Sequence, residues 1–308
     1  MLKIFLNRLL WTIPVLWLVA TVTFFLMYAA PGGPWDAKSG DRFLDPGLAA
    51  SFNRKYGLDE PIWRQYVIYL GNAARFDFGD SYRREGTPVE EIILDGFPYS
   101  AKIGLLAFGI SLAIGIPVGI IAALKHNSLV DYVSLLVATV GYTLPSFVLA
   151  IFFLVIFAVQ LEWVPVLFRD WRGYILPSVV LGIGGSAFLA RLTRSSMLEV
   201  MGQDHVRTAR AKGLKHRMVV LRHIVRNGMI PVLTVTGPAL AGLITGTIII
   251  ERVFGVPGMG YLFIDSISAR DYPVIMGTTL FYAFMVVLGN LMVDLTYILA
   301  DPRIRSIR

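Results

Sequence analysis

The chain has 308 residues, of which 56% are hydrophobic and 16% charged, and its mean hydropathy is +0.65. A soluble domain of this composition would expose large apolar patches and aggregate, so the composition excludes a soluble globular protein and indicates an integral membrane protein. The absence of cysteine excludes disulfides, thiolate metal sites and a cysteine nucleophile. The net charge of +7 would suit nucleic acid, but in a membrane protein the distribution of charge matters more than its sum.

Six segments are apolar and long enough to be membrane spans. The first, Leu9–Ala30, contains no charged residue and would be about 33 Å long as a helix, enough to cross a bilayer. Its apolar core is too long for a typical signal peptide, and Tyr28-Ala29-Ala30 is a poor cleavage site, so we expect a retained anchor. The other predicted spans are Tyr99–Leu124, Tyr132–Val159, Tyr174–Leu192, Ile230–Ile250 and Val274–Ala300.

The positive charges predict the orientation of these spans. If both termini lie inside, the inner segments hold 15 Lys/Arg and four acids, whereas the outer segments hold 13 bases and 16 acids. Cytoplasmic loops of membrane proteins carry an excess of Lys and Arg. We therefore expect a multi-pass protein of the cytoplasmic (inner) membrane with both termini in the cytoplasm.

The segment between the first two spans, residues 31–98, is then an extracytoplasmic loop domain. Asp59-Glu60-Pro61 is typical of a helix start. One face of that helix would carry Ile62, Tyr66, Tyr69 and Leu70. The loop could form a packed cap over the span ends, contact an external partner, or do both.

Small residues and prolines are frequent inside the predicted spans. The pairs Gly115/Gly119 and Gly242/Gly246 have the spacing that lets membrane helices approach closely. Prolines inside spans predict kinks, and they occur at positions 117, 145 and 238. Tight packing of a bundle explains both features, and a path lined by kinked helices is the functional alternative.

Two further features are candidates for the translocation pathway. Asp294 is an acid well inside a span, where carboxylates are costly and tend to be functional, although it lies near the cytoplasmic end and could be structural. The run Phe254–Leu262 is apolar and rich in glycine, which favours a re-entrant segment at the outer mouth over a solvated hairpin, with buried packing as the alternative. The pathway or outer-gate candidates are Pro145, Phe254, Gly255, Pro257, Gly258, Met259 and Asp294.

The most unusual segment is the basic loop Arg191–Gly228, which carries nine Lys/Arg and two acids. Asp204 is expected to cap a short helix over residues 205–211, with Gly213 in a left-handed C-terminal cap. A second helix is predicted over residues 216–227. We expect the short helix to present the small side chains of Val206, Ala209 and Ala211 to a partner's groove.

Two other uses of this loop are less favoured. A basic helix lying on anionic lipid would carry large apolar anchors, which the short helix lacks. A nucleic-acid site would be accompanied by an aromatic platform or a recognised motif, and neither is present.

The loop resembles the EAA loop of bacterial ABC importer permeases, written Glu-Ala-Ala-x3-Gly-x9-Ile-x-Leu-Pro. Ala209 and Gly213 match that pattern, whereas its Glu and Leu-Pro are absent. The form Arg-Thr-Ala-Arg-Ala-Lys-Gly-Leu is similar to the oligopeptide/dipeptide permease branch. Other segments that resemble this branch are Ala30-Pro31-Gly32, Asp59-Glu60-Pro61, Phe76-Asp77-Phe78-Gly79, Phe254–Gly260, Arg270-Asp271-Tyr272 and Asp301-Pro302-Arg303.

This resemblance implies an all-α membrane protein with the type I ABC importer permease fold, in which residues 1–308 form one permease domain of the B type. It also implies a homologous second permease subunit, two cytoplasmic ABC ATPases, an extracytoplasmic peptide-binding protein and surrounding lipid as partners. The coupling region would be residues 194–229, with its helix at 204–216. The coupling residues would be Arg207, Thr208, Ala209, Arg210, Ala211, Lys212, Gly213 and Leu214.

The sequence itself favours a non-catalytic subunit. It contains no Gly-x4-Gly-Lys-Ser/Thr phosphate loop, so ATP and Mg²⁺ would bind to partner ATPases, and we expect no cofactor or metal in this chain. Nickel chelates, glutathione or another small solute are alternative substrates within the same class. An ion-coupled carrier using Asp294 is a rival, whereas an intramembrane enzyme is disfavoured because the four histidines lack metal-ligand spacing.

Overall fold

The computed structural model describes the backbone of residues 2–35 and 46–300 and the side chains of residues 10–35, 47 and 50–292. The regular structure of these residues is helical, apart from a β-bridge between Asp80 and Pro88. This confirms the all-α class. The α-helices span Leu2–Ala29 (α1), Pro46–Tyr56 (α2), Ile62–Ala73 (α3), Val89–Leu124 (α4), Leu129–Thr143 (α5), Ser146–Phe153 (α6), Ile175–Met201 (α7), Asp204–Ala211 (α8), His216–Val219 (α9), Arg226–Ile244 (α10), Ile248–Phe254 (α11), Met259–Ala269 (α12) and Tyr272–Ala300 (α13). Two π-helical segments, Leu154–Gln160 (η2) and Val220–Val225 (η4), and a 3₁₀ turn, Trp171–Tyr174 (η3), join some of them.

Five helical segments of the described chain are long and apolar enough to cross a membrane, and the bent pair Leu129–Thr143 and Ser146–Gln160 makes a sixth span if it counts as one. The chain is therefore a multi-pass membrane protein. The second span begins earlier than predicted, because α4 is one helix of 36 residues from Val89. Its first turns belong to the segment that we expected to be loop.

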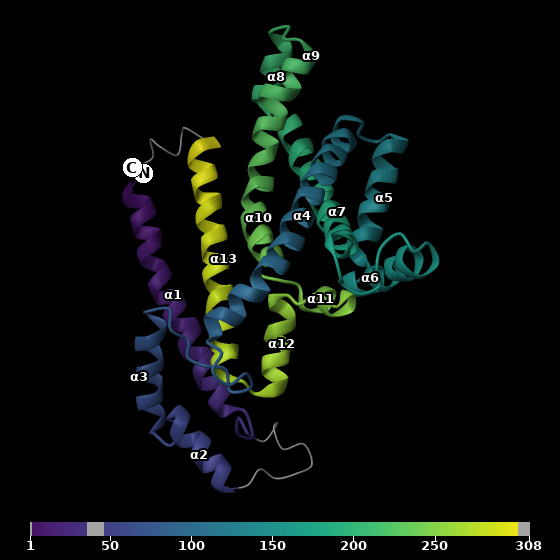
Figure 1. The fold of residues 1–308 in the computed structure, drawn as a ribbon. Coiled ribbons are helices and arrows are strands. Elements are labelled where there is room, and N and C mark those ends of the chain that lie inside the picture. Colours follow the sequence, from purple (N-terminus) through teal and green to yellow (C-terminus); the bar gives the residue numbers. More distant parts are fainter. Residues whose placement is uncertain (1, 36–45, 301–308) are drawn as a thin grey trace. The chain divides into compact units, whose positions relative to one another are not determined.

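The third predicted span is broken rather than kinked. α5 and the helix that follows it bend by 98° at a break of a few residues (Figure 1). Pro145 stands at the break as the residue before α6, and its φ of −57° is close to the value that the proline ring imposes. The predicted kink at Pro145 is therefore a sharp break between two helices.

The fifth predicted span, Ile230–Ile250, is also wrong at both ends. Its helix is continuous with the segment beginning at His216, passes through Pro238, and ends at Ile244. Gly246 follows with a φ of +106°, a conformation that residues with a Cβ rarely adopt. A separate short helix, α11, then carries Ile250.

The described chain divides into two compact units, and α4 and α13 each contribute residues to both. The first unit comprises the segments up to residue 100, 245–248 and 257–288. In it, α3 packs along α1 (Figure 1): the hydroxyls of Thr21 and Tyr66 lie 2.7 Å apart, and Phe24 stacks on Tyr69. The helix starts directly after Pro61 as predicted, but Ile62 is 49% exposed and does not share the buried face.

In the same unit, a buried carboxylate fixes residues 81–83, which lie between the first two spans. Asp271, which is 3% exposed between α12 and α13, accepts hydrogen bonds from the Ser81 hydroxyl and from the backbone N–H groups of Tyr82 and Arg83. The Arg83 guanidinium donates in turn to the carbonyl of Ala269, at 2.9 and 2.7 Å. Burial among aromatic rings raises the pKa of Tyr82 well above its usual value. Residues 81–83 are thereby tied to the turn that precedes α13.

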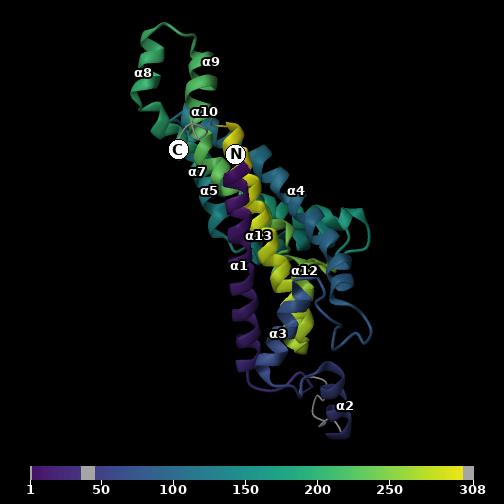
Figure 2. The ribbon, with the colours of Figure 1, turned by 90° about the vertical axis from the view of Figure 1, so that its left-hand side faces the viewer.

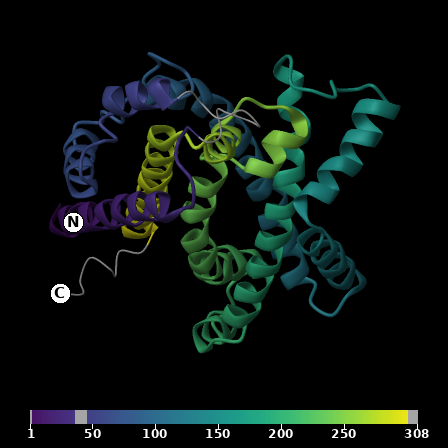
Figure 3. The ribbon, with the colours of Figure 1, turned by 90° about the horizontal axis from the view of Figure 1, so that it is seen from below.

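The second unit comprises residues 101–244, 249–256 and 289 onward, and α7 is its central helix. It contacts α5, α6 and α10, and Figure 3 shows α10 running beside it. Gly115 and Gly119 let α4 approach α7 closely, since an added Cβ would lie 2.7 Å from the Ser186 carbonyl oxygen and 2.6 Å from that of Ala190. The first glycine pair is thus confirmed as a packing device.

The second glycine pair does not bring two helices of the described chain together. An added Cβ at Gly242 would meet nothing within 4 Å. Gly246 lies outside α10 altogether. The two glycines have the spacing of a helix-packing motif, but α10 ends at Ile244, between them.

Candidate coupling surface

The basic loop folds as a helical hairpin in the second unit, and α8 and α9 lie side by side in it (Figure 2). α7 ends at Met201, where Gly202 interrupts it as predicted, and α8 begins at Asp204. The predicted cap is wrong by one residue, because Gln203 is the N-cap residue and makes no side-chain cap bond. Asp204 instead occupies the first turn, where its negative charge favours the positive end of the helix dipole.

One face of α8 is buried in the protein itself. Val206 is 0% and Ala209 4% exposed, and both belong to a cluster with Met197 of α7, Val219 of α9 and Ile224 of η4. The expectation that Val206 and Ala209 face a partner is therefore wrong. Their small size serves close packing of α8 against its own hairpin.

The turn after α8 has the geometry that the sequence predicted. Gly213 has a φ of +72°, its N–H donates to the Arg210 carbonyl at 2.9 Å, and the Leu214 N–H donates to the Ala209 carbonyl at 3.4 Å. These two bonds form a Schellman C-cap, which satisfies carbonyls at the end of the helix. An added Cβ would meet nothing within 4 Å, so the glycine is required by the backbone angle and not by crowding.

The exposed side of the hairpin is basic. Of the eight predicted coupling residues, the seven other than Ala209 are exposed: Arg207, Thr208, Arg210, Ala211, Lys212, Gly213 and Leu214. The Leu214 side chain is 37% exposed and adds an apolar contact at the tip. Asp204 faces Arg207 across 3.4 Å, and both side chains are largely in solvent, so this ion pair contributes little to stability. The surface can dock in a groove that is acidic and has an apolar floor.

A set of hydrogen bonds that the sequence did not predict, here called the polar clasp, joins α8 to the start of α10 through His205 and Asn227. The Asn227 amide nitrogen lies 3.1 Å from His205 Nε2, and the same amide donates to the His223 carbonyl at 2.9 Å. His205 is on α8, and Asn227 is on α10. The clasp therefore joins the short helix to the helix that leads into the fifth span.

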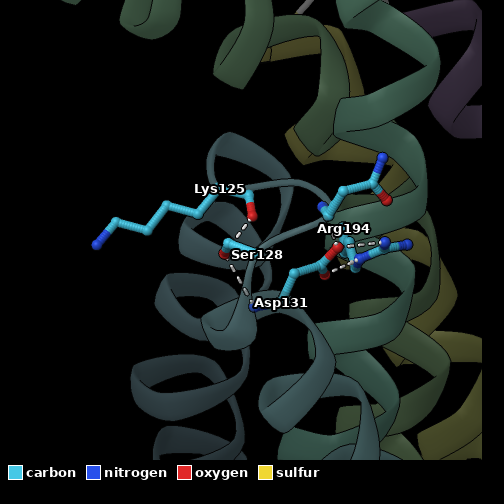
Figure 4. Close-up of polar contacts among 5 residues, drawn as sticks. Lys125, Ser128, Asp131 and Arg194 are labelled. Carbon is cyan, nitrogen blue, oxygen red and sulfur yellow. Dashed lines mark hydrogen bonds and ion pairs between the residues drawn. The ribbon is translucent and has the colours of Figure 1, made fainter.

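A second unpredicted contact lies where α5 meets α7 (Figure 4). The Arg194 guanidinium donates to both carboxylate oxygens of Asp131, with Nε–Oδ1 at 2.5 Å and Nη2–Oδ2 at 2.8 Å. The Asp131 side chain is 1% exposed and that of Arg194 18%. Ser128 caps α5, and Asp131 also accepts from the backbone N–H of Asn127 at 3.0 Å. An acid near a span end and an arginine in the basic loop were both visible in the sequence, but their pairing was not.

The pathway candidates are not brought together at one described site. Phe254 and Gly255 fall in the second unit, and Pro257, Gly258 and Met259 in the first. Phe254 is 3% and Met259 3% exposed, which is the buried packing that we gave as the alternative; a re-entrant position remains a prediction. Gly255 has a φ of +65°, and an added Cβ would lie 3.0 Å from Leu167.

Two other pathway candidates complete the set. Pro145 marks the bend between α5 and α6 and is exposed. The side chain of Asp294 lies outside the described residues. Among the residues that the structure describes, no group of three or more His, Cys, Asp or Glu could hold a metal ion.

Comparison with known proteins defines the class. Residues 115–306 match the model of the binding-protein-dependent transport system inner membrane component, and residues 1–104 match the model of the N-terminal part of such a membrane component. The chain belongs to this family, the permease subunits of ABC importers.

Individual relatives cover almost the whole chain. It is 41% identical to the oligopeptide transport system permease protein OppB of Escherichia coli K12 over 99% of this chain and 100% of that one. It is 40% identical to OppB of Haemophilus influenzae over 99% and 100%, and 40% identical to the dipeptide transport system permease protein DppB of Bacillus subtilis over 93% and 92%. Among solved structures, the inward-facing methionine ABC transporter MetNI matches with a TM-score of 0.50 at 16% identity, covering 70% of this chain and 96% of that one, which supports the fold.

Proposed function

We propose that this chain is the B-type permease subunit of an ATP-driven importer of dipeptides and oligopeptides, and that it forms half of the translocation pathway with a homologous second permease. The names of relatives that are about 40% identical over nearly the full length support the peptide substrate. The family supports the division of labour, in which an external binding protein delivers the substrate and two cytoplasmic ATPases bind ATP and Mg²⁺.

The proposed topology has six spans, with the bent pair at residues 129–160 counted as one, and both termini in the cytoplasm. Residues 31–98 then lie outside as an extracytoplasmic loop domain and residues 194–229 inside as the coupling region. The excess of Lys and Arg in the inner segments supports this orientation.

The observation that carries the function is the two-sided character of α8. Its exposed side, with Arg207 and Arg210, offers charge to an ATPase, whereas Val206 and Ala209 fasten the other side to α7, α9 and η4. A displacement of α8 by closing ATPases would therefore be passed to α7 and α10 rather than absorbed by a flexible loop. Packed helices transmit such motion because they do not deform continuously.

The test is reconstitution of the complete transporter, with its second permease, ATPases and binding protein, in liposomes. We expect a labelled dipeptide and a labelled pentapeptide to enter on addition of ATP, and to remain outside when the ATPases cannot hydrolyse it. Uptake of a nickel chelate or glutathione in place of peptides would reassign the substrate. Uptake that needs a proton gradient and no ATP would overturn the importer.

A further inference from the structure

The first unit contains a cavity of about 270 Å³ beside the break between α10 and α11. Thr245, Ile248, Met259, Phe263, Thr279 and Tyr282 line it, together with Gly246 and other small groups. Irregular backbone at membrane depth is tolerated where it is buried in protein or lines a cavity. The irregular backbone at the break in the fifth span therefore forms part of the cavity wall.

The lining is neutral. None of the residues around the cavity carries a charge. The hydroxyl of Thr279 donates to the Ile275 carbonyl at 2.7 Å, and that of Thr278 donates to Val274 at 2.6 Å, so both protons are used within α13. A charged group would lose hydration here and would find no opposite charge among the lining residues, whereas an apolar group has little hydration to lose.

The size of the cavity suits one side chain. An engineered apolar cavity of about 150 Å³ in another protein binds benzene, so this larger space has room for an aromatic ring. Sites that enclose a whole drug-sized molecule occupy about 300–1,000 Å³. At about 270 Å³ the cavity lies just below that range, and it is large enough for a single large side chain.

From this size and chemistry, we propose that the cavity is a subsite that receives one apolar or aromatic side chain of the transported peptide. The inference rests on the proposed function. It adds that the permease itself, and not only the binding protein, selects peptides with a neutral, bulky side chain. Met259 and Phe263 supply a deformable and an aromatic wall, which suit side chains of several shapes.

The experiment compares uptake of three tripeptides, Ala-Ala-Ala, Ala-Phe-Ala and Ala-Lys-Ala, by the complete reconstituted transporter. Thr279→Phe fills the cavity and should lower the ratio of Phe-peptide to Ala-peptide uptake by about 10-fold, a typical effect of steric change in an apolar pocket. Thr279→Asp should raise the ratio of Lys-peptide to Ala-peptide uptake. Because each variant is compared with the wild type using the same binding protein, the selectivity of that protein cancels.

Thr234→Phe is the matched control. Thr234 also donates to a carbonyl of its own helix, at 3.0 Å, but it is exposed on α10 and does not line the cavity. It should leave both ratios unchanged. If Thr279→Phe fails to assemble, Tyr282→Ala, which enlarges the cavity, should raise the relative uptake of Ala-Trp-Ala.

Equal loss of all three peptides, or unchanged ratios in the assembled Thr279 variants, would overturn the subsite. So would unchanged ratios with a change in co-purifying lipid, measured by mass spectrometry, since the cavity would then hold an acyl chain. If the wild-type transporter imports none of the peptides, the proposed function itself fails.

Discussion

Asp131 and Arg194 form a bidentate ion pair that joins the first turn of α5 to α7 across 63 residues of sequence. Both carboxylate oxygens are engaged, and the aspartate side chain is almost completely buried. Parallel N–H···O bonds of this kind fix geometry as well as adding energy. The pair therefore sets the position of α5 on α7, the helix that leads into the hairpin of α8 and α9.

Asp131→Asn should destabilise the protein because it removes the charge while leaving the Arg194 guanidinium inside. We expect a loss of roughly 1.5–3 kcal/mol, the usual value for hydrogen bonds to charged groups. Thermal unfolding of the detergent-purified transporter measures it. Asp170→Asn is the control, because Asp170 pairs with Arg172 at 3.2 Å with both side chains about half exposed, and its melting temperature should stay near the wild type. Equal melting of both variants would contradict the structural role of the buried pair.

Gly213 should tolerate asparagine but not valine. At a φ of +72° a residue with a Cβ is strained by roughly 1–2 kcal/mol, and asparagine adopts this region more readily than β-branched residues do. Since an added Cβ meets no neighbour, the difference must come from the backbone. We expect Gly213→Val to lower ATP-driven peptide uptake and Gly213→Asn to preserve most of it. Normal uptake by the valine variant would mean that the cap is dispensable.

The two features of the structure that the sequence predicted best are local. Gly213 lies just beyond a run of helix-forming residues, where a C-cap glycine belongs, and Pro61 lies at the start of α3. Such signals depend on neighbours within a few positions. The family motif predicts a use for the hairpin but not the orientation of its side chains, so the prediction that Val206 and Ala209 face a partner is wrong.

Long-range pairings and internal breaks were beyond the sequence. Asp271 lies 190 residues from Ser81, and the sequence around either residue does not predict that the two form a hydrogen bond. The break at Gly246 is hidden because residues on both sides of it are apolar, so hydropathy continues across a point where the helix does not. Pro145 was visible as a kink, but the 98° bend depends on what packs around it.

The two sides of α8 should respond differently to substitution. Ala209→Leu would overfill a site that is 4% exposed and should cost about 1–3 kcal/mol of stability. Arg210→Ala, on the exposed side, should leave the melting temperature unchanged but reduce ATP-driven uptake. Measuring melting and uptake on both variants separates a packing role from a docking role. A stable, fully active Arg210→Ala transporter would remove that arginine from the proposed contact.

Asp271→Asn should loosen the segment at residues 81–83 because an amide cannot accept all the hydrogen bonds that the carboxylate does. We expect faster hydrogen exchange at the backbone amides of Tyr82 and Arg83, which donate to it at 3.0 and 3.3 Å. Asp77→Asn is the matched control, since Asp77 accepts from Gly79 at 3.0 Å on the exposed part of the same segment. Its effect should stay confined to Gly79. Unchanged exchange at Tyr82 and Arg83 in Asp271→Asn would show that the neighbouring aromatic rings, rather than the carboxylate, hold this segment against α13.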